Sequence, residues 1–488
     1  MRRRGSLTVF FALILVVTMT LVFALAELIR VKALSDLAIG YTDEAVESAF
    51  SEYNAYLWTN YKILGVDMAY GTEGSGPGMM ENRIREFAEN NANPEGGKSL
   101  VRETAEQASL DQYSLLTDGN GAGMIYEGVR AAKDGLLVNA IDGMMASSDS
   151  INNMESVDTD SMVAEAKESI ASAQAEAAES EESDSTEVIE VDDDPLEDYE
   201  SLKALMAQGI LGTVVPDTSA LSQAQIDLSG APSNRSLNHG TGAAVSDNSF
   251  LDKALYMEYL LTEFSYYGEE KGHDGLVYEV EYTIANKETD EENLAAIVER
   301  LLAIREAANF ATIMGSSNLT SQAELMAEAL STLAGPLAEA VYPVVYIAVV
   351  AAWAYIESTL DVRLILKGGK VSIVKSEEEW TSDIFHLASV LDVNKTAKEC
   401  SSGLNYKEYL ASFLALTSLD TLGLRSCDIL ENALNTQENY ENVKIDNMLY
   451  KADVTIEYKG YEMFLSLLKP ATVATDGYRF EKKKSMSY

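Results

Sequence analysis

The chain has 488 residues, which is enough for two or three domains, and its hydrophobic (47%) and charged (23%) fractions are those of a folded globular protein. Its 78 acidic and 36 basic side chains give a formal net charge of −42. A field of that sign repels nucleic acid and anionic lipid headgroups, so we expect a solvated surface and no nucleic-acid partner.

An apolar run near the N-terminus is the strongest signal in the sequence. It extends from Leu7 to Ala26, follows three arginines, and its only polar residues are three threonines. A threonine in a helix can bond back to a carbonyl one turn earlier, so none of them interrupts the run. About twenty helical residues cover about 30 Å, the thickness of the hydrocarbon core. The run therefore predicts a transmembrane helix over residues 6–29.

The charges beside this helix predict its orientation. The leader arginines, Arg2 to Arg4, favour a cytoplasmic N-terminus by the positive-inside bias. Arg30 and Lys32 on the other side weaken the asymmetry, but Glu27 and Asp36 lie beside them. We expect a single-pass protein of the cell membrane whose bulk is extracellular.

Two alternatives to this topology remain open. Ala24-Leu25-Ala26 resembles a signal-peptidase site, although the apolar run is longer than a usual signal and the helical pattern continues past it. Residues 340–356 carry no charge over a stretch at the lower limit for a second span. Pro343, several tyrosines and the absence of flanking basic residues favour a buried core helix there.

The basic leader also carries a family resemblance. Arg4-Gly5-Ser6 and the following Thr8-Val9-Phe10-Phe11-Ala12-Leu13 resemble the start of TadE/TadG-like pseudopilins of tight-adherence pilus systems, which are relatives of type IV pilins. The resemblance implies cleavage by a prepilin peptidase between Gly5 and Ser6 and packing against other pilin-like subunits through the N-terminal helix. It also implies a glutamate near the fifth mature position, where this chain has Phe10.

Beyond the membrane segment the composition predicts four regions. Residues 30–70 carry an apolar stripe at helical spacing and predict a stalk helix, which either binds a partner or packs on the protein's own body. Residues 71–145 predict a small mixed region with helices and a strand near 108–117. Residues 146–250 are rich in Ser, Ala and acidic side chains, with 12 acids between Glu179 and Glu200, and predict a disordered linker or insertion.

Residues 251–488 predict an α+β domain. Helical stripes are expected at 251–264, 321–334, 338–359 and 406–424, and Thr289 with Glu292 forms a capping-box pattern before another helix. Alternation predicts strands at Leu276–Ile284 and Asp446–Tyr461. Helices outnumber strands without regular alternation between them, so the expected fold class is α+β and mostly helical.

A narrower resemblance rests on three stretches of this domain and on the N-terminal start. They are Leu301-Leu302-Ala303-Ile304-Arg305-Glu306-Ala307-Ala308-Asn309-Phe310, then Trp353-Ala354-Tyr355-Ile356-Glu357-Ser358 with Leu360-Asp361-Val362-Arg363, and Glu379-Trp380. Together they resemble a clostridial family of membrane proteins of unknown function that is found alongside tight-adherence pilus genes. The resemblance implies no activity and no site residues.

Few residues suggest chemistry. The three histidines, His239, His273 and His386, are far apart in sequence, and no catalytic or nucleotide-binding motif appears. We expect Arg305-Glu306 and Asp361-Arg363 to be ion pairs that hold helices. Asp192-Asp193-Asp194 lacks the spacing of a calcium loop, so a solvated acidic run is the favoured interpretation over weak calcium binding. No catalytic, cofactor, metal or small-molecule site is predicted, and we do not expect an enzyme.

The two cysteines leave one question open. Cys400 and Cys427 either pair, which would close a loop of about 28 residues and stabilise by on the order of 3 kcal/mol, or remain buried thiols.

The expected function is a membrane-anchored structural or assembly component of a tight-adherence pilus system. The alternative is a membrane-tethered surface binding or sensory module unrelated to pili.

Overall fold

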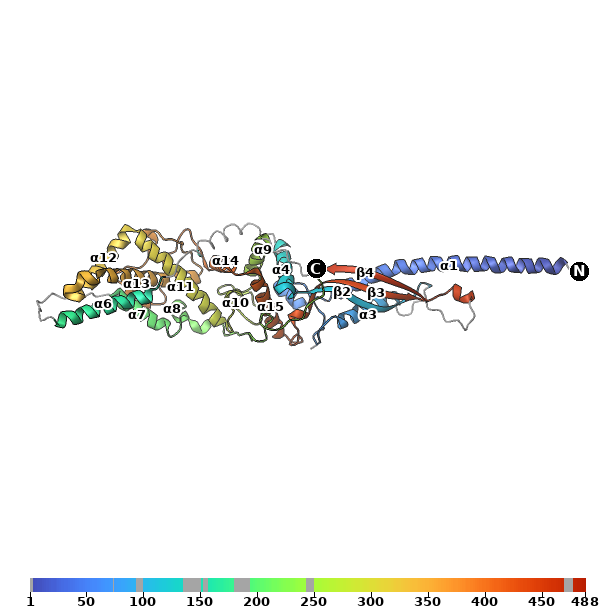
Figure 1. Ribbon diagram of the computed structural model, residues 1–488, viewed down its shortest axis with the longest axis horizontal. Helices are drawn as coiled ribbons and strands as arrows, with labels where there is room; N and C mark the ends of the chain where they lie inside the picture. The colour runs from blue at the N-terminus through green and yellow to red at the C-terminus, as the bar shows by residue number, and fades with distance from the viewer. Residues whose placement is uncertain are drawn as a thin grey trace. The chain divides into compact units, whose positions relative to one another are not determined.

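The computed structural model describes residues 3–72, 74–93, 100–134, 151, 157–179, 194–242, 250–468 and 477–488. These residues are mostly helical and include one small antiparallel sheet, so the predicted α+β, mostly helical class is confirmed (Figure 1). The chain divides into two compact units. Unit 1 comprises residues 1–131, 230–247 and 426–488, and unit 2 comprises residues 132–229 and 248–425.

Unit 1 is built on a four-stranded antiparallel sheet. The central strand β3 (Met448–Gly460) pairs with β2 (Glu103–Leu115) along one edge and with β4 (Tyr478–Ser487) and the short β1 (Val66–Asp67) along the other. Every second residue of β3 is buried, as the alternation in its sequence predicts. The predicted strand at Asp446–Tyr461 is thereby confirmed.

One face of the sheet is covered by α1 (Arg3–Phe50) and α3 (Gly78–Ala92). Small residues on α1, among them Ala38, Ala45 and Ala49, allow the helix to lie close to the strands. The stripe predicted for the stalk therefore packs on the protein's own body.

The helix ends at Phe50, earlier than the predicted stalk, and Asn54 caps the separate helix α2 (Ala55–Tyr61). Helices α4 (Asp118–Asp134) and α15 (Leu419–Asn435) have residues in both units.

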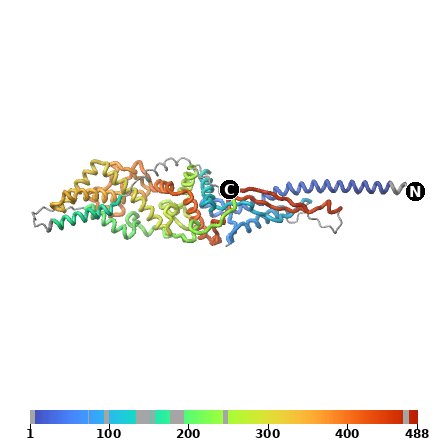
Figure 2. The backbone as a smooth tube through the Cα atoms, in the orientation of Figure 1, coloured from blue at the N-terminus to red at the C-terminus, as the bar shows by residue number. Residues whose placement is uncertain are grey.

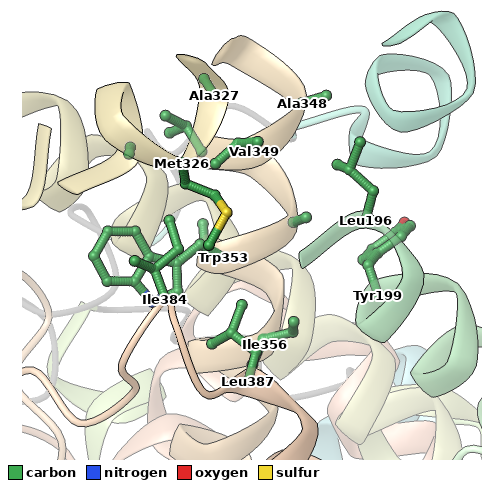
Figure 3. Packing of buried hydrophobic residues seen from close by; sticks show 14 of the residues in the cluster. Leu196, Tyr199, Met326, Ala327, Ala348, Val349, Trp353, Ile356, Ile384 and Leu387 are labelled. Carbon is green, nitrogen blue, oxygen red and sulfur yellow. The ribbon is translucent and has the colours of Figure 1, made fainter. Parts of the chain in front are cut away.

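Unit 2 surrounds the long apolar helix α13 (Ala338–Leu366), whose residues 348–363 are all buried. Figure 3 shows Trp353 of α13 packed near Met326 and Ile384, and its indole nitrogen donates to the Ser382 hydroxyl at 2.8 Å. The uncharged segment 340–356 is thus part of a core helix in this structure. The helices around it are α6 (Thr159–Glu179), α7 (Pro195–Met206), α8 (Leu211–Val214), α11 (Asp290–Gly315) and α12 (Ser317–Ser331).

The remaining helices of unit 2 are α9 (Phe250–Glu263), α10 (Glu279–Ala285) and α14 (Tyr406–Leu416). Single 3-10 turns are η2 (Thr218–Ala220), η3 (Thr332–Leu337), η4 (Glu377–Glu379) and η5 (Leu387–Leu391), and unit 1 adds η6 (Ile445–Asn447) and η7 (Leu465–Leu468). The capping box predicted from Thr289 and Glu292 is present at the start of α11.

The predicted strand at Leu276–Ile284 is wrong, because these residues lead into α10. The alternation arose from Glu279 and Glu281, which are buried as completely as the apolar residues between them. Glu279 accepts a hydrogen bond from the Ser265 backbone at 2.6 Å, and Glu281 accepts one from the Tyr406 hydroxyl at 2.7 Å. Buried carboxylates with hydrogen-bond partners produce the same alternation of polar and apolar residues as the solvent-facing row of a strand.

The disorder predicted for the linker or insertion at 146–250 is wrong for its described residues, 151, 157–179, 194–242 and 250. Helices α6 and α7 form there and place Val163, Ala166, Leu196 and Tyr199 in the core of unit 2. The predicted domain 251–488 also differs from the structure, since its residues 426–488 belong to unit 1. Strand β3 pairs with β2, which lies more than 300 positions earlier in the chain. Local sequence patterns do not reveal a pairing over that separation.

Candidate membrane anchor and its junction

The first half of α1 is an apolar surface that is exposed along most of its length. From Leu7 to Leu25 its large side chains other than Phe23 are exposed, with values such as 60% for Leu7, 62% for Leu13 and 66% for Val17. Thr18 and Thr20 donate their hydroxyls to the carbonyls of Ile14 and Val16, at 2.9 and 2.8 Å. The helix is long and apolar enough to cross a membrane. An exposed apolar surface of this extent marks an interaction with lipid or with protein.

The first buried side chains along α1 are those of Glu27 and Arg30, which are 1% and 7% exposed, although Leu28 and Ile29 beside them remain exposed. The Glu27 carboxylate accepts hydrogen bonds from the backbone N–H groups of Met463 and Phe464, the latter at 2.6 Å. Arg30 donates to Glu27 at 3.1 Å and to the carbonyl of Tyr461 at 2.6 Å. Spacing of three places both side chains on the face of α1 that meets the sheet, so this pair ties the helix to the end of the β3–β4 hairpin.

Close packing continues along the same face of α1. Leu34 is fully buried beside Gly460, where an added Cβ would lie 2.7 Å from the end of the Leu34 side chain and would force it to shift. Thr42 bonds to the Tyr458 hydroxyl at 3.1 Å, and Lys484 of β4 reaches Asp43 at 3.2 Å. One continuous helix is therefore exposed and apolar in its first half and fixed to the sheet in its second.

A buried acid, Glu103, lies at the start of β2 near this junction and is 1% exposed. Neither of its carboxylate oxygens has a hydrogen-bond partner among the described residues. Burial raises its pKa to about 7, against the opposing influence of Lys482 and Arg30. The pKa of Glu103 therefore depends on how completely the packing of α1 on the sheet buries its carboxyl group.

The sequence-predicted site residues are not brought together. Gly5 and Ser6 lie near the beginning of α1. Cys400 belongs to unit 2 and Cys427 to unit 1, and both are free and buried, so the candidate disulfide is not formed. Asp192 and Asp193 lie outside the described residues. Within the described ranges no group of three or more His, Cys, Asp or Glu could hold a metal ion.

A second cluster of charged residues lies in unit 2, where Arg305, Asp361, Lys375 and Glu357 all have fully buried side chains. Arg305 donates to Asp361 at 3.0 Å and to the Ser372 carbonyl at 2.9 Å. Lys375 contacts both carboxylates, and Glu357 also accepts from the Ser382 backbone at 2.8 Å. Two cations and two carboxylates balance one another without access to solvent, so the cluster can fix α11 on α13 but cannot meet a substrate.

The electrostatics of this cluster follow from its geometry. Burial acts to lower the pKa of Lys375, but Asp361 and Glu357 outweigh it and leave that pKa raised. Both cations therefore stay charged at neutral pH. Losing one carboxylate would leave a buried positive charge without its partner.

The predicted ion pairs Arg305-Glu306 and Asp361-Arg363 are wrong, because these residues bind other partners. Arg305 pairs with Asp361 rather than with Glu306, which bonds to Thr159 and whose pKa is raised to about 7 by burial. Arg363 donates to three backbone carbonyls, those of Thr213, Asp392 and Lys395. Adjacent charges on a helix point in different directions, so the true partners come from other elements.

The sequence analysis did not identify Glu27, Arg30, Glu103 or Lys375 as partners in these contacts. A usable signal existed for the first two, because a charged pair three residues apart directly follows the apolar run. Lys375 lies in a loop among Ser and Glu residues and offers no such signal.

Comparison with known families places the chain in a family. A model described as a family of unknown function, DUF5702, matches residues 185–460, which is more than half of the chain. The chain belongs to that family. The matched region contains the three stretches that meet in and around the buried cluster of unit 2, and it ends at the last residue of β3. No curated protein and no solved structure matches the chain.

Proposed function

We propose that this protein is a membrane-anchored, extracytoplasmic structural or assembly component of a tight-adherence pilus system, with no catalytic role. The observation that carries the proposal is the division of α1 into an exposed apolar half and a half packed on the sheet of unit 1. The exposed half needs a non-aqueous environment, and the packed half transmits its position to the folded body. Residues 7–26 are the proposed membrane span.

The surroundings of Arg30 and Lys32 support a cytoplasmic N-terminus. Arg30 is buried against the body, and Lys32 lies 3.1 Å from Asp36, so neither presents an unopposed charge beside the span. The leader arginines, Arg2 to Arg4, then dominate the positive-inside bias. The burial of α13 in the core of unit 2 supports a single pass.

The pilus assignment rests on the resemblance of the N-terminal start to pseudopilins. An exposed apolar helix can be covered by lipid before assembly and by the equivalent helices of other subunits afterwards. Cleavage between Gly5 and Ser6 would remove the basic leader and allow the helix to leave the bilayer. Phe10, which stands where that family has a glutamate, removes one charge that would favour subunit entry.

The test is intact mass and N-terminal sequencing of the protein isolated from its native membrane, together with co-isolation of pilus components. We expect a chain beginning at Ser6 that co-purifies with pilin-like subunits. A chain that begins at Met1 and never associates with such subunits overturns the pilus role and favours a tethered surface binding or sensory module. A chain that begins at Glu27 overturns the anchor itself.

A further inference from the structure

The end of the β3–β4 hairpin carries an unusually apolar, exposed segment. We call residues 461–468 the tip segment; its sequence is Tyr-Glu-Met-Phe-Leu-Ser-Leu-Leu, with one charged residue. Leu467 is 69% exposed, Tyr461 54%, Leu468 43% and Met463 38%. In a chain with a net charge of −42, such a cluster at the surface requires a reason.

The tip segment is held at the end of the apolar run of α1. Figure 2 shows the backbone that follows β3 running beside α1. The backbone N–H groups of Met463 and Phe464 bond to the Glu27 carboxylate, and the Phe464 ring stacks on Phe23 with centroids 6.4 Å apart. Phe23 lies about one helical turn before the run ends at Ala26. If the run spans the hydrocarbon core, Phe23 lies roughly 5 Å inside its outer boundary. Phe464, whose ring centroid is 6.4 Å from that of Phe23, then lies close to this boundary.

The residues at the ends of β3 and β4, beside the tip segment, are of types that favour the headgroup layer. Tyr461 and Tyr478 stand at the two sides of the hairpin, and Lys459 pairs in register with Arg479 one step further from the tip. Arg479 is largely exposed, its side chain at 62%. Tyrosines and basic side chains with long apolar stems are enriched at membrane interfaces. Leu100, whose carbonyl accepts from Arg30 at 2.5 Å, adds another exposed leucine at this level, at 61%.

We propose that the tip segment is a second membrane contact, which inserts into the outer leaflet beside α1. The proposal rests on the anchoring of α1 proposed above. One helix alone would leave the body free to tilt about its axis, whereas a helix and a hairpin end fix unit 1 in one orientation on the bilayer. The occupant is lipid, because the tip segment continues the apolar surface of α1 and is fixed to it by Glu27, at the depth that the span itself sets.

The test places an environment-sensitive fluorophore on single cysteines of the full chain, reconstituted in phosphatidylcholine vesicles with or without nitroxide lipids, labelled either just below the headgroup or deep in the acyl chain. Leu467→Cys reports on the tip segment. Leu15→Cys reports on the anchor, and Leu325→Cys, at an exposed leucine of α12, is the matched control (60% exposed against 69% for Leu467). The native cysteines are buried and are not labelled under native conditions.

We expect blue-shifted emission and at least a two-fold loss of intensity from nitroxide lipids at positions 15 and 467, with no change at 325. Quenching at 15 without quenching at 467 overturns the inference and leaves the anchor intact. Failure at both positions overturns the proposed anchoring. A blue shift at 467 that lipid does not quench and that grows with protein density means that a second copy covers the tip segment, which also overturns the inference.

Discussion

Helices α1 and α13 are both long and apolar enough to cross a membrane, yet their surroundings in the structure are opposite. From Leu7 to Leu25 the large side chains of α1 other than Phe23 are exposed, whereas residues 348–363 of α13 are buried without exception. The second half of α13 contains Glu357, Asp361 and Arg363, and each has a buried partner from another element. Between Leu7 and Leu25 the polar residues of α1 are threonines, and Thr18 and Thr20 bond to carbonyls of their own helix.

The difference teaches that hydropathy reports a need for a non-aqueous environment and does not say what supplies it. Polar residues that can only be satisfied by distant protein groups indicate a core helix. Polar residues that are satisfied within their own turn are compatible with lipid, because lipid offers no partner. This criterion distinguishes the two helices where length and composition do not.

The largest effect is expected from an arginine placed in each helix. Val350→Arg puts an unpaired charge in the core of unit 2 and should abolish its folding, a loss on the order of 5 kcal/mol or more. Val16→Arg should leave the thermal unfolding of both units in detergent unchanged but reduce membrane retention, since arginine at a span centre costs roughly 2.5–3.5 kcal/mol. Near-ultraviolet circular dichroism and membrane fractionation measure the two outcomes.

Leu325→Arg, at an exposed residue of α12, is the control and should change neither folding nor retention. The conclusion that α13 is a core helix is contradicted if Val350→Arg folds normally and is lost from the membrane. That result would make α13 a span.

The next effect concerns the buried cluster that identifies α13 as a core helix. Asp361→Ala leaves Arg305 and Lys375 without their shared carboxylate, and we expect it to cost about 3–5 kcal/mol in urea unfolding of unit 2. Asp36→Ala removes an exposed partner of Lys32 on α1 and should cost less than about 1 kcal/mol. Equal losses in the two variants would mean that the cluster contributes nothing beyond an ordinary surface pair.

The sequence predicted elements that depend on local patterns. The apolar run of α1, the alternation of β3 and the capping box of α11 were all read correctly, because each is encoded within a few neighbouring residues. Strand β2 was located only in part. Its buried residues follow spacings of two and three, since bulges near Glu106 and Asp111 each insert a residue and interrupt the alternation.

Contacts between residues that are far apart in the sequence could not be predicted from local patterns. Helix α6 buries mainly small residues such as Ala166 and Ala173, so its composition suggested a linker although α13 provides a surface for it. The candidate anchor was predicted as a helix, but its junction was not. The Glu27 carboxylate meets backbone groups of residues 463 and 464, and a backbone N–H has no signature in the sequence.

A smaller effect is expected at Glu103, beside the packed half of α1. Its pKa is about 7 in the folded protein and near the ordinary value of 4.5 in the unfolded chain. The contribution of the protonated group is therefore fully present below pH 4.5 and is lost as the pH rises through 7, by up to about 3 kcal/mol. Glu103→Gln should remove this loss, so that the variant is more stable than the wild type at pH 8 by about 2–3 kcal/mol.

The measurement is the difference in unfolding free energy between the two proteins from pH 4.5 to 8 in detergent. The difference isolates Glu103 from Glu281 and Glu306, whose pKa values burial also raises to about 7. A difference that does not vary with pH would show that Glu103 is ionised and paired in the folded state.

The smallest effect sharpens the comparison at the point where α1 passes from its exposed half to its packed half. Phe23 and Phe464 are the first side chains along α1 to meet across the junction, and a stacked aromatic pair contributes about 0.5–1.5 kcal/mol beyond its buried area. A double-mutant cycle with Phe23→Leu and Phe464→Leu, followed by unfolding of unit 1 in detergent, should return a coupling in that range. Phe10 and Phe11, whose rings lie 6.1 Å apart within the exposed half, are the control pair and should show no coupling to unfolding. Coupling in the control but not at the junction would place the boundary between the lipid-facing and protein-facing halves of α1 nearer its N-terminus than Glu27.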